Sequence, residues 1–373
     1  MSSRLSSDRA QVLAANALVV KVGSSTLTQG THALDLAFVD DLARQIAHLH
    51  REGRHVVLVS SGAIRVGLGA LGLTAARTMP EKQAAAAVGQ GLLMHSYQEV
   101  FARHGLRVAQ VLLTRNDLAD RHRFLNARNT FRTLLAFGVV PIVNENDTVA
   151  VDEIQFGDND TLAALVAIAA ECEAVALLSD VPGFSPDGKR GGVLPEVHTL
   201  TAELLAAASG ADGRGGTGGM LTKLEAAKVA MRSGIPLVLA HGREPEVVLR
   251  LARGEALGTL FVPRSGLNAR KRWIAFAGRP RGVVVVNEGA KQSLLAHGKS
   301  LLPVGVVAVR GNFEQGDLIA LEDEHGHAFA RGLVNYNATD AARIAGLRTH
   351  RIARALGKKD FDELVHRDNL VVT

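Results

Sequence analysis

The chain has 373 residues, of which 47% are apolar and 4% aromatic, and its net charge is +5. This length exceeds one ordinary hydrophobic core, so we expect two domains, and a single cysteine excludes a fold built on disulfides. The longest apolar runs, such as 162–170, fall short of the ~20 residues that a membrane-spanning helix needs, and residues 1–10 lack the apolar segment of a signal peptide. The sequence therefore predicts a cytoplasmic protein with no membrane partner.

Strand and helix patterns alternate through the first 262 residues. Buried apolar runs predict strands at 18–22, 55–59, 108–113, 139–143, 174–178, 235–240 and 259–262. Helical spacing of apolar residues predicts helices over 35–50, 80–103, 126–137, 161–170, 201–208, 224–233 and 244–253. Nearly continuous apolar strands that alternate with helices are typical of a mostly parallel sheet covered on both faces. The expected fold class is α/β, a three-layer αβα sandwich with a mostly parallel central sheet.

The pattern changes after residue 262. Residues 263–280 predict a basic linker, and short β runs follow at 283–286, 305–310, 317–321 and 328–333, with small helices over 290–296 and 338–345. We therefore expect a catalytic domain over 1–262 and a small β-rich domain over 281–373. Residues 265–373 hold 16 Lys and Arg against 11 Asp and Glu, which accounts for the whole net charge. This modest basic excess indicates a second domain with a partner of its own.

A dense polar stretch follows the strand predicted at 139–143. Residues 144–160 include three Asn and six acidic residues. In open parallel sheets, ligands bind beyond the carboxyl ends of the strands, where this stretch would lie. Its amides and carboxylates suit a substrate with its own ammonium and carboxylate groups, or a metal. The competing interpretation is a solvated acidic loop.

Two further segments suit an anionic ligand. Lys21 lies at the end of the first predicted strand and precedes the turn Gly23–Ser24–Ser25, whose backbone N–H groups can meet phosphate. Residues 213–223 hold five glycines and end on Lys223, where a helix is expected to start. A solvated lysine at a strand end and a flexible linker are the respective alternatives. The sequence contains no P-loop, no dinucleotide-binding fingerprint in its proper context, no hydrolase nucleophile motif and no paired histidines at metal-binding spacing.

Several segments resemble the amino acid kinase family, and within it the members that phosphorylate glutamate. They occur in the family's order and span about residues 18–262: 21–25, 59–64, 80–91, 126–130, 144–147, 157–160 and 216–223. From residue 281 the chain is similar to the PUA domain that is often fused to this kinase, with residues 332–336 near its end. The resemblance implies ATP-dependent phosphorylation, with Mg²⁺, of the side-chain carboxylate of L-glutamate to L-glutamyl 5-phosphate, the first step of proline biosynthesis.

The resemblance also implies a role for individual residues. The residues that flank or orient the ATP phosphates, and so carry catalysis, would be Lys21, Lys223 and Asp160. The residues that hold glutamate, or lie close to it, would be Ser61, Asp147, Asn159, Asn144 and Asp158. The residues that contact the nucleotide would be Lys21, Gly23, Ser179, Asp180, Thr217, Gly218, Gly219, Met220, Leu221, Thr222 and Lys223. No protein residue is assigned to a metal.

The resemblance implies partners as well. They are proline as a feedback inhibitor at or overlapping the glutamate site, a glutamyl phosphate reductase that consumes the labile product, and further copies of the chain in a homo-oligomer. Two other functions stay open. One is a family member with another carboxylate, carbamate or nucleotide substrate, although a nucleotide acceptor would favour Arg over the amides and acids of 144–160. The other is a non-catalytic RNA-binding protein, and RNA binding by the PUA-like domain is left open because aromatic residues are few.

Overall fold

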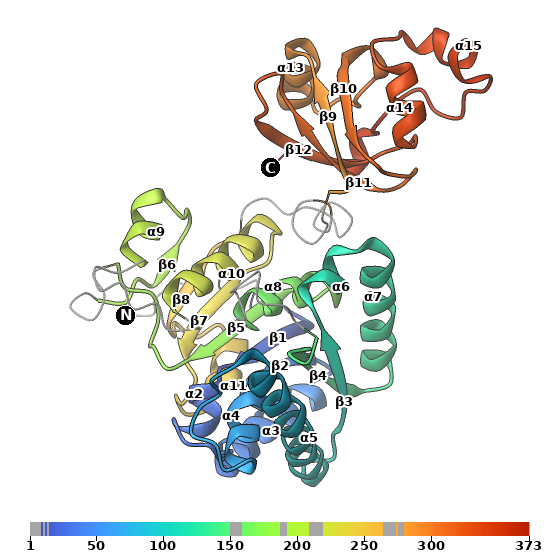
Figure 1. Ribbon diagram of the computed structural model, residues 1–373. Coiled ribbons are helices and arrows are strands. Elements are labelled where there is room, and N and C mark those ends of the chain that lie inside the picture. Colours follow the sequence, from blue (N-terminus) through green and yellow to red (C-terminus); the bar gives the residue numbers. More distant parts are fainter. Residues whose placement is uncertain are drawn as a thin grey trace. The chain divides into compact units, whose positions relative to one another are not determined.

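The computed structural model describes residues 15–149, 159–186, 192–208, 219–263 and 280–372, together with Arg9, Val12 and Ile274. The chain divides into two compact units, Met1–Leu118 with Phe124–Gly266, and Ala119–Arg123 with Leu267–Thr373. Each unit has a sheet of its own (Figure 1). The domain boundaries proposed at 1–262, 263–280 and 281–373 stay a prediction, because most of the expected linker lies outside the described residues.

An eight-stranded sheet in the order β3-β4-β2-β1-β5-β7-β8-β6 organises the first unit. Its strands are β1 (Ala17–Val22), β2 (His55–Ser60), β3 (Arg107–Leu113), β4 (Val139–Glu145), β5 (Ala174–Ser179), β6 (Glu196–Val197), β7 (Leu237–His241) and β8 (Thr259–Phe261). Every neighbouring pair is parallel except β7 and β8. The mostly parallel sheet is therefore confirmed. The sequence missed β6, because two residues are too few to show an alternating pattern.

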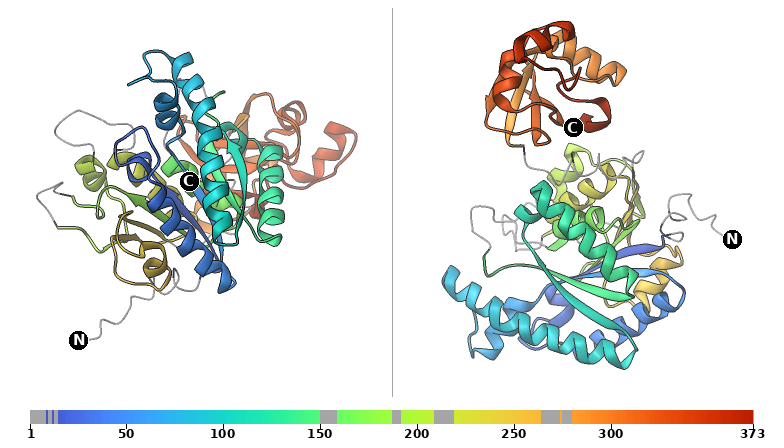
Figure 2. Two further views of the ribbon diagram at one scale, coloured as in Figure 1. Left: turned by 90° about the horizontal axis from the view of Figure 1, so that it is seen from below. Right: turned by 90° about the vertical axis from the view of Figure 1, so that its right-hand side faces the viewer.

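Helices cover both faces of this sheet. They are α2 (Ser24–Thr28), α3 (Leu36–Arg51), α4 (Ala63–Ala70), α5 (Met79–Arg103), α6 (Arg115–Ala119), α7 (Arg121–Ala136), α8 (Asn159–Ala169), α9 (Ala202–Ala208), α10 (Met220–Arg232) and α11 (Val247–Ala252). On one face α3, α5 and α11 pack against the strands, and on the other α8 and α10 do so (Figures 1 and 2). This arrangement is the expected three-layer sandwich. The sequence missed the short helices α2, α4 and α6.

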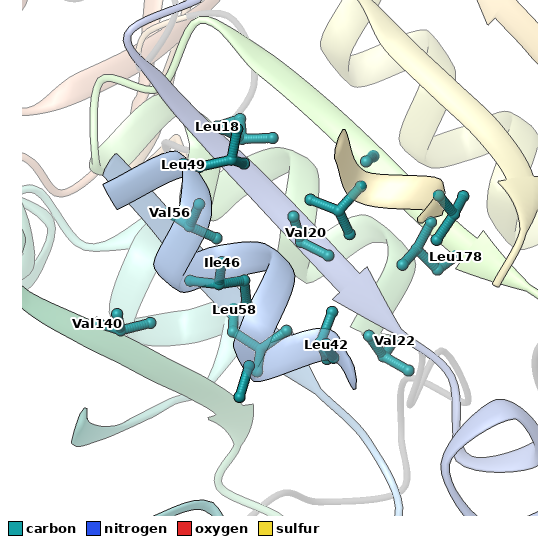
Figure 3. Close-up of a cluster of buried hydrophobic side chains, with 14 of the residues drawn as sticks. Leu18, Val20, Val22, Leu42, Ile46, Leu49, Val56, Leu58, Val140 and Leu178 are labelled. Atoms are coloured by element: carbon teal, nitrogen blue, oxygen red, sulfur yellow. The ribbon is translucent and has the colours of Figure 1, made fainter. Parts of the chain in front are cut away.

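The strand alternation of β1 decides which of its side chains reach each layer. Leu18, Val20 and Val22 are buried in a hydrophobic cluster with residues of α3 such as Leu42 and Ile46 (Figure 3). Burying one such aliphatic side chain contributes about 1.5–3 kcal/mol, so this face is firmly held. Successive residues of a strand point to opposite faces. Lys21, between Val20 and Val22, is thereby directed to the layer that contains α8.

Close packing of α4 against α5 depends on two glycines. A Cβ atom on Gly67 would lie 1.8 Å from the backbone oxygen of Ala85, and one on Gly89 would lie 1.7 Å from that of Ala63. Both distances are far below any real contact, so only glycine allows this helix crossing. Gly67 is the first glycine of a run that matches a dinucleotide fingerprint, but here it serves helix packing. The crossing fixes α5, which passes beside the carboxyl ends of β2 and β4.

The second unit is a five-stranded sheet in the order β10-β9-β11-β12-β13. Its elements are β9 (Gly282–Val286), α13 (Glu288–His297), β10 (Val306–Gly311), β11 (Leu318–Glu322), β12 (Ala328–Leu333), α14 (Ala338–Ile344), α15 (Ile352–Leu356) and β13 (Leu370–Val372). The strands pair antiparallel except β9 with β11. This confirms the β-rich character predicted for the C-terminal part. The sequence did not predict α15, β13 or the short 3-10 helices Pro303–Gly305, Thr349–Arg351 and Arg367–Asn369.

Candidate active site

The carboxyl ends of four neighbouring strands, β4, β2, β1 and β5, meet at one edge of the first sheet. Backbone hydrogen bonds tie the turns that follow them. The N–H of Ser61 donates to the oxygen of Val22 at 3.2 Å, and the N–H of Gly23 donates to that of Leu178 at 3.3 Å. Residues that follow different strands are thus brought side by side, as the crevice rule for parallel sheets predicts.

Lys21, Asp160 and Lys223 form a buried charged cluster at this edge. The Nζ atom of Lys21 lies 2.5 Å from Oδ1 of Asp160, and the Nζ atom of Lys223 lies 3.1 Å from Oδ2. Relative exposure is 5% for each lysine and 1% for the aspartate. The three side chains come from β1, the first turn of α8 and the first turn of α10. The structure therefore joins residues that the sequence could only propose one by one.

The charges of this cluster favour the binding of an anion. Two ammonium groups and one carboxylate sum to a charge of +1, held where solvent screens it little. Coulomb interactions are several times stronger at the low effective dielectric of such a site than in water. The carboxylate holds two like charges close together, and an anion that reaches the ammonium groups would be attracted. The arrangement suits a polyanion whose negative charge grows during a reaction.

An amide network lies beside the charged cluster. The Nδ2 group of Asn159 is 2.8 Å from Oγ of Ser61, 3.2 Å from the backbone oxygen of Ser60 and 3.0 Å from Oδ1 of Asn144. Asn159 immediately precedes Asp160 at the start of α8, so one helix end supplies both the network and the charged cluster. Three of the residues predicted to hold glutamate, Ser61, Asn144 and Asn159, are in direct contact.

Helix α5 extends the network in a way that the sequence does not predict. Nδ2 of Asn144 donates to Oε1 of Gln90 at 2.9 Å. Two turns further along α5, the Tyr97 hydroxyl lies 2.8 Å from Oγ of Ser60, and burial raises the pKa of that tyrosine. Gln90 and Tyr97 lie in the middle of a helix. The sequence indicated a site only where polar residues follow a predicted strand, so neither residue was singled out. The only signal for Gln90 was its place in the segment 80–91.

Asp147 lies two residues beyond β4 and is partly buried. Burial raises the pKa of its carboxyl above the usual range for aspartate, and the charge of Lys82 opposes that rise. The carboxylate of Asp147 is therefore destabilised in the free site, and a cation that binds beside it would recover part of that cost. An α-ammonium group has the required charge.

The described residues that were predicted to contact the nucleotide occupy three places: the end of β5, the start of α10 and the turn after β1. Ser179 ends β5, and its hydroxyl donates to Oδ1 of Asp180 at 3.0 Å, while its backbone oxygen accepts from Gly242 at 2.7 Å. Gly219 caps the start of α10, and the hydroxyl of Thr222 donates to its oxygen at 2.7 Å. Met220 and Leu221 complete that first turn. Gly23 follows β1, and a Cβ there would lie 3.7 Å from Nζ of Lys21, an ordinary contact.

Comparison with known proteins decides the family. Residues 16–241 match the family model described as Amino acid kinase family, and residues 282–356 match the one described as PUA domain. The chain belongs to the amino acid kinase family. It is 50% identical over 364 residues to the glutamate 5-kinase of Moorella thermoacetica, with 96% of each chain covered. Identity to the glutamate 5-kinase of Bordetella parapertussis is 52% over 368 residues, with 97% of each covered.

Three residues proposed for the site of this amino acid kinase, Asp158, Thr217 and Gly218, lie outside the described residues. Within the parts of the kinase that the structure describes, no three His, Cys, Asp or Glu side chains are grouped so as to hold a metal ion. Over the same residues, no helix of the kinase has both the length and the apolar character needed to cross a bilayer.

Proposed function

We propose that this amino acid kinase transfers the γ-phosphoryl group of ATP to the side-chain carboxylate of L-glutamate. The products are ADP and L-glutamyl 5-phosphate, and the reaction is the first step of proline biosynthesis. The observation that carries the proposal is the meeting of Lys21 and Lys223 on the carboxylate of Asp160, beside an amide network. The near-50% identity to glutamate 5-kinases over almost the whole chain supports it.

For this reaction the protein mainly has to position the two substrates and neutralise the charge of the phosphates. One oxygen of the glutamate γ-carboxylate forms a bond to the γ-phosphorus as the bond from that phosphorus to the β–γ bridging oxygen breaks. A glutamate side chain has a pKa of about 4.3, so the attacking group is already ionised and no general base is required. Repulsion between this carboxylate and the polyphosphate must be overcome. Ammonium groups that neutralise the β- and γ-phosphates lower that barrier.

We infer which residues carry out these tasks. Lys21 and Lys223 would flank the β- and γ-phosphates, and Asp160 would hold both ammonium groups in place. The residues that would hold or border glutamate are Ser61, Asn144, Asp147, Asp158 and Asn159. The residues that would contact the nucleotide are Gly23, Ser179, Asp180, Thr217, Gly218, Gly219, Met220, Leu221 and Thr222.

The donor set of the site fits a magnesium ion that is bound mainly through the nucleotide. Mg²⁺ in kinases keeps several waters and uses one or two carboxylates together with substrate phosphates. Asp160 is the carboxylate at the cluster, and an ammonium group already faces each of its oxygens. Phosphate oxygens and water would thus supply most ligands, with Asp160 in reach. The ion would neutralise charge on the phosphates, and the lysines would complete that neutralisation.

An assay with hydroxylamine tests the proposed activity directly. Protein, ATP, Mg²⁺ and hydroxylamine are incubated with single amino acids, and the hydroxamate formed from any acyl phosphate is measured. We expect hydroxamate with L-glutamate and at most traces with L-aspartate or L-glutamine. Product with another carboxylate instead of glutamate would favour a different member of the family. No glutamate-dependent product would overturn the proposal.

Further proposals concern partners. We infer that proline inhibits by competing with glutamate, that a glutamyl phosphate reductase consumes the labile acyl phosphate, that the chain forms a homo-oligomer and that it works in the cytoplasm. The resemblance to glutamate kinases and the lability of acyl phosphates support these proposals. Proline that lowers the maximal rate without raising the KM for glutamate would contradict the first. Whether the basic PUA domain binds RNA can be measured by titrating single-stranded RNA at two salt concentrations.

A further inference from the structure

Backbone groups fix the orientation of two side-chain amides in the amide network, Asn159 and Asn144, and Asn144 in turn fixes that of Gln90. The Nδ2 group of Asn159 must face the carbonyl oxygen of Ser60, because a carbonyl only accepts. Oδ1 of Asn144 must face the N–H of Glu145, because a backbone N–H only donates. Nδ2 of Asn144 therefore donates, and its partner on Gln90 is Oε1. The network admits one arrangement of donors and acceptors, although nitrogen and oxygen of an amide look alike.

This arrangement leaves one donor group and one acceptor unused. Nε2 of Gln90 and Oδ1 of Asn159 are buried and have no hydrogen-bond partner among the described residues. Buried polar groups are nearly always paired in native proteins, and an unpaired one is costly. Gln90 is only partly buried as a residue, so its side chain lies at the margin of the site. An unused N–H group suits a carboxylate and an unused amide oxygen suits an ammonium, which are the two groups of an α-amino acid.

The order of contacts indicates which end of the substrate meets Gln90. Asp160, with its two lysines, adjoins Asn159, which contacts Asn144, which in turn contacts Gln90. On the branch of the network that runs through Asn144, Gln90 is thus the member furthest from the charged cluster. A glutamate whose γ-carboxylate approaches the phosphates at the charged cluster would extend its α-carbon end along the network.

We propose that Gln90 is a substrate-binding residue that determines specificity: its Nε2–H group donates to an oxygen of the α-carboxylate of L-glutamate, while Oε1 orients Asn144. This inference rests on the proposed function. It adds helix α5 to the glutamate site, whose other described residues end or follow a strand or begin α8. The close α4–α5 crossing through Gly67 and Gly89 gives the helix the rigid position that such a contact requires.

The variant Gln90→Glu separates the two tasks of the side chain. It keeps an oxygen that accepts from Asn144, removes the donor and adds a negative charge that repels the α-carboxylate. We expect the KM for glutamate to rise about 10- to 100-fold, as loss of a hydrogen bond to a charged group implies. The KM for ATP should stay within about twofold. Gln98→Glu, at an exposed position on the same helix, is the control and should change neither constant.

A substrate analogue distinguishes contact from mere positioning. Isoglutamine has an α-carboxamide, whose N–H can donate to the new carboxylate of Gln90→Glu. We expect kcat/KM to fall for glutamate and to rise for isoglutamine in this variant. Equal falls for both substrates, or an unchanged KM for glutamate, would overturn the proposal. If Gln90→Glu does not fold, Gln90→Met must raise the KM for glutamate without improving isoglutamine, and an unchanged KM would refute the idea equally. Absence of glutamate-dependent hydroxamate from the wild-type protein would instead reject the proposed function.

Discussion

The ammonium groups of Lys21 and Lys223 share one carboxylate: Asp160 receives the first at 2.5 Å on Oδ1 and the second at 3.1 Å on Oδ2. Lys21 is the penultimate residue of the first strand, and Lys223 comes from a helix late in the same unit. The opposite charge between them helps to hold these two like charges together. The pair is thereby preorganised for an anion that contacts both ammonium groups, which is how charge-stabilising sites lower barriers.

Replacing Lys223 by alanine should depress turnover far more than it weakens glutamate binding. The lysine is proposed to neutralise charge that develops on the phosphates, so its loss acts mainly on the transition state. We expect kcat to fall about 100- to 1,000-fold, and the KM for glutamate to change much less. Steady-state kinetics in the hydroxamate assay measures both. Lys228→Ala, on the same helix with its side chain 38% exposed, is the matched control. Equal turnover in the two variants would count against the phosphate role.

Asp160→Asn should destabilise the first unit. The carboxylate is almost fully buried between two buried ammonium groups, and removing one partner of such a cluster leaves charge uncompensated. Losses of this kind are about 3–5 kcal/mol. Urea unfolding followed by far-UV circular dichroism, to which the helices of the first unit contribute most, should show a lower midpoint at unchanged slope. Glu225→Gln removes an exposed partner of Lys228 and should lower the free energy of unfolding by less than about 1 kcal/mol. Equal midpoints for the two variants would show that Asp160 does not hold the cluster.

The α4–α5 crossing predicts opposite outcomes for two glycines that are two residues apart. A Cβ on Gly89 would overlap the backbone oxygen of Ala63, whereas a Cβ on Gly91 meets nothing within 4 Å. Gly89→Ala should therefore cost about 3 kcal/mol or more, since backbone cannot give way as a side chain does. Gly91→Ala should stabilise helix α5 by about 0.5–1 kcal/mol. Thermal unfolding of both variants decides the matter, and a stable Gly89→Ala protein would disprove the close crossing.

Because of Asp147, we expect kcat/KM for glutamate to fall on the acid side of its pH profile. Burial raises the pKa of this carboxyl, so protonation and loss of its charge begin at a higher pH than for an exposed aspartate. As pH falls through that raised pKa, kcat/KM for glutamate should drop. In Asp147→Asn this fall should move to lower pH, near the pKa of the side-chain carboxyl of the substrate, about 4.3. Lys82→Met should move it up, because the charge of Lys82 lowers the pKa of Asp147.

The pH profiles are read from initial rates, after a check that each protein keeps its activity when returned to neutral pH. An acid limb at the same pH in Asp147→Asn and in the wild-type protein would show that another group is responsible.

Local pattern sufficed for much of this protein. The apolar runs indicate where the parallel strands lie, because a strand buried on both faces must be apolar along its length. Polar residues directly after those strands mark the ligand edge from the sequence alone. Helix ends were less certain: α10 begins at Met220, so Lys223 lies inside its first turn, and α7 begins at Arg121.

Short stretches of the chain are thus enough to establish the α/β class, the two-part organisation and the candidates Lys21, Lys223, Asn144 and Asn159. The folded arrangement was needed to show that both lysines meet Asp160, that Gln90 joins the amides, and that Gly67 and Gly89 let two helices touch. These relationships depend on distances between elements remote in the chain. The packing of the helices on the sheet sets those distances, and a short stretch of sequence carries no information about that packing.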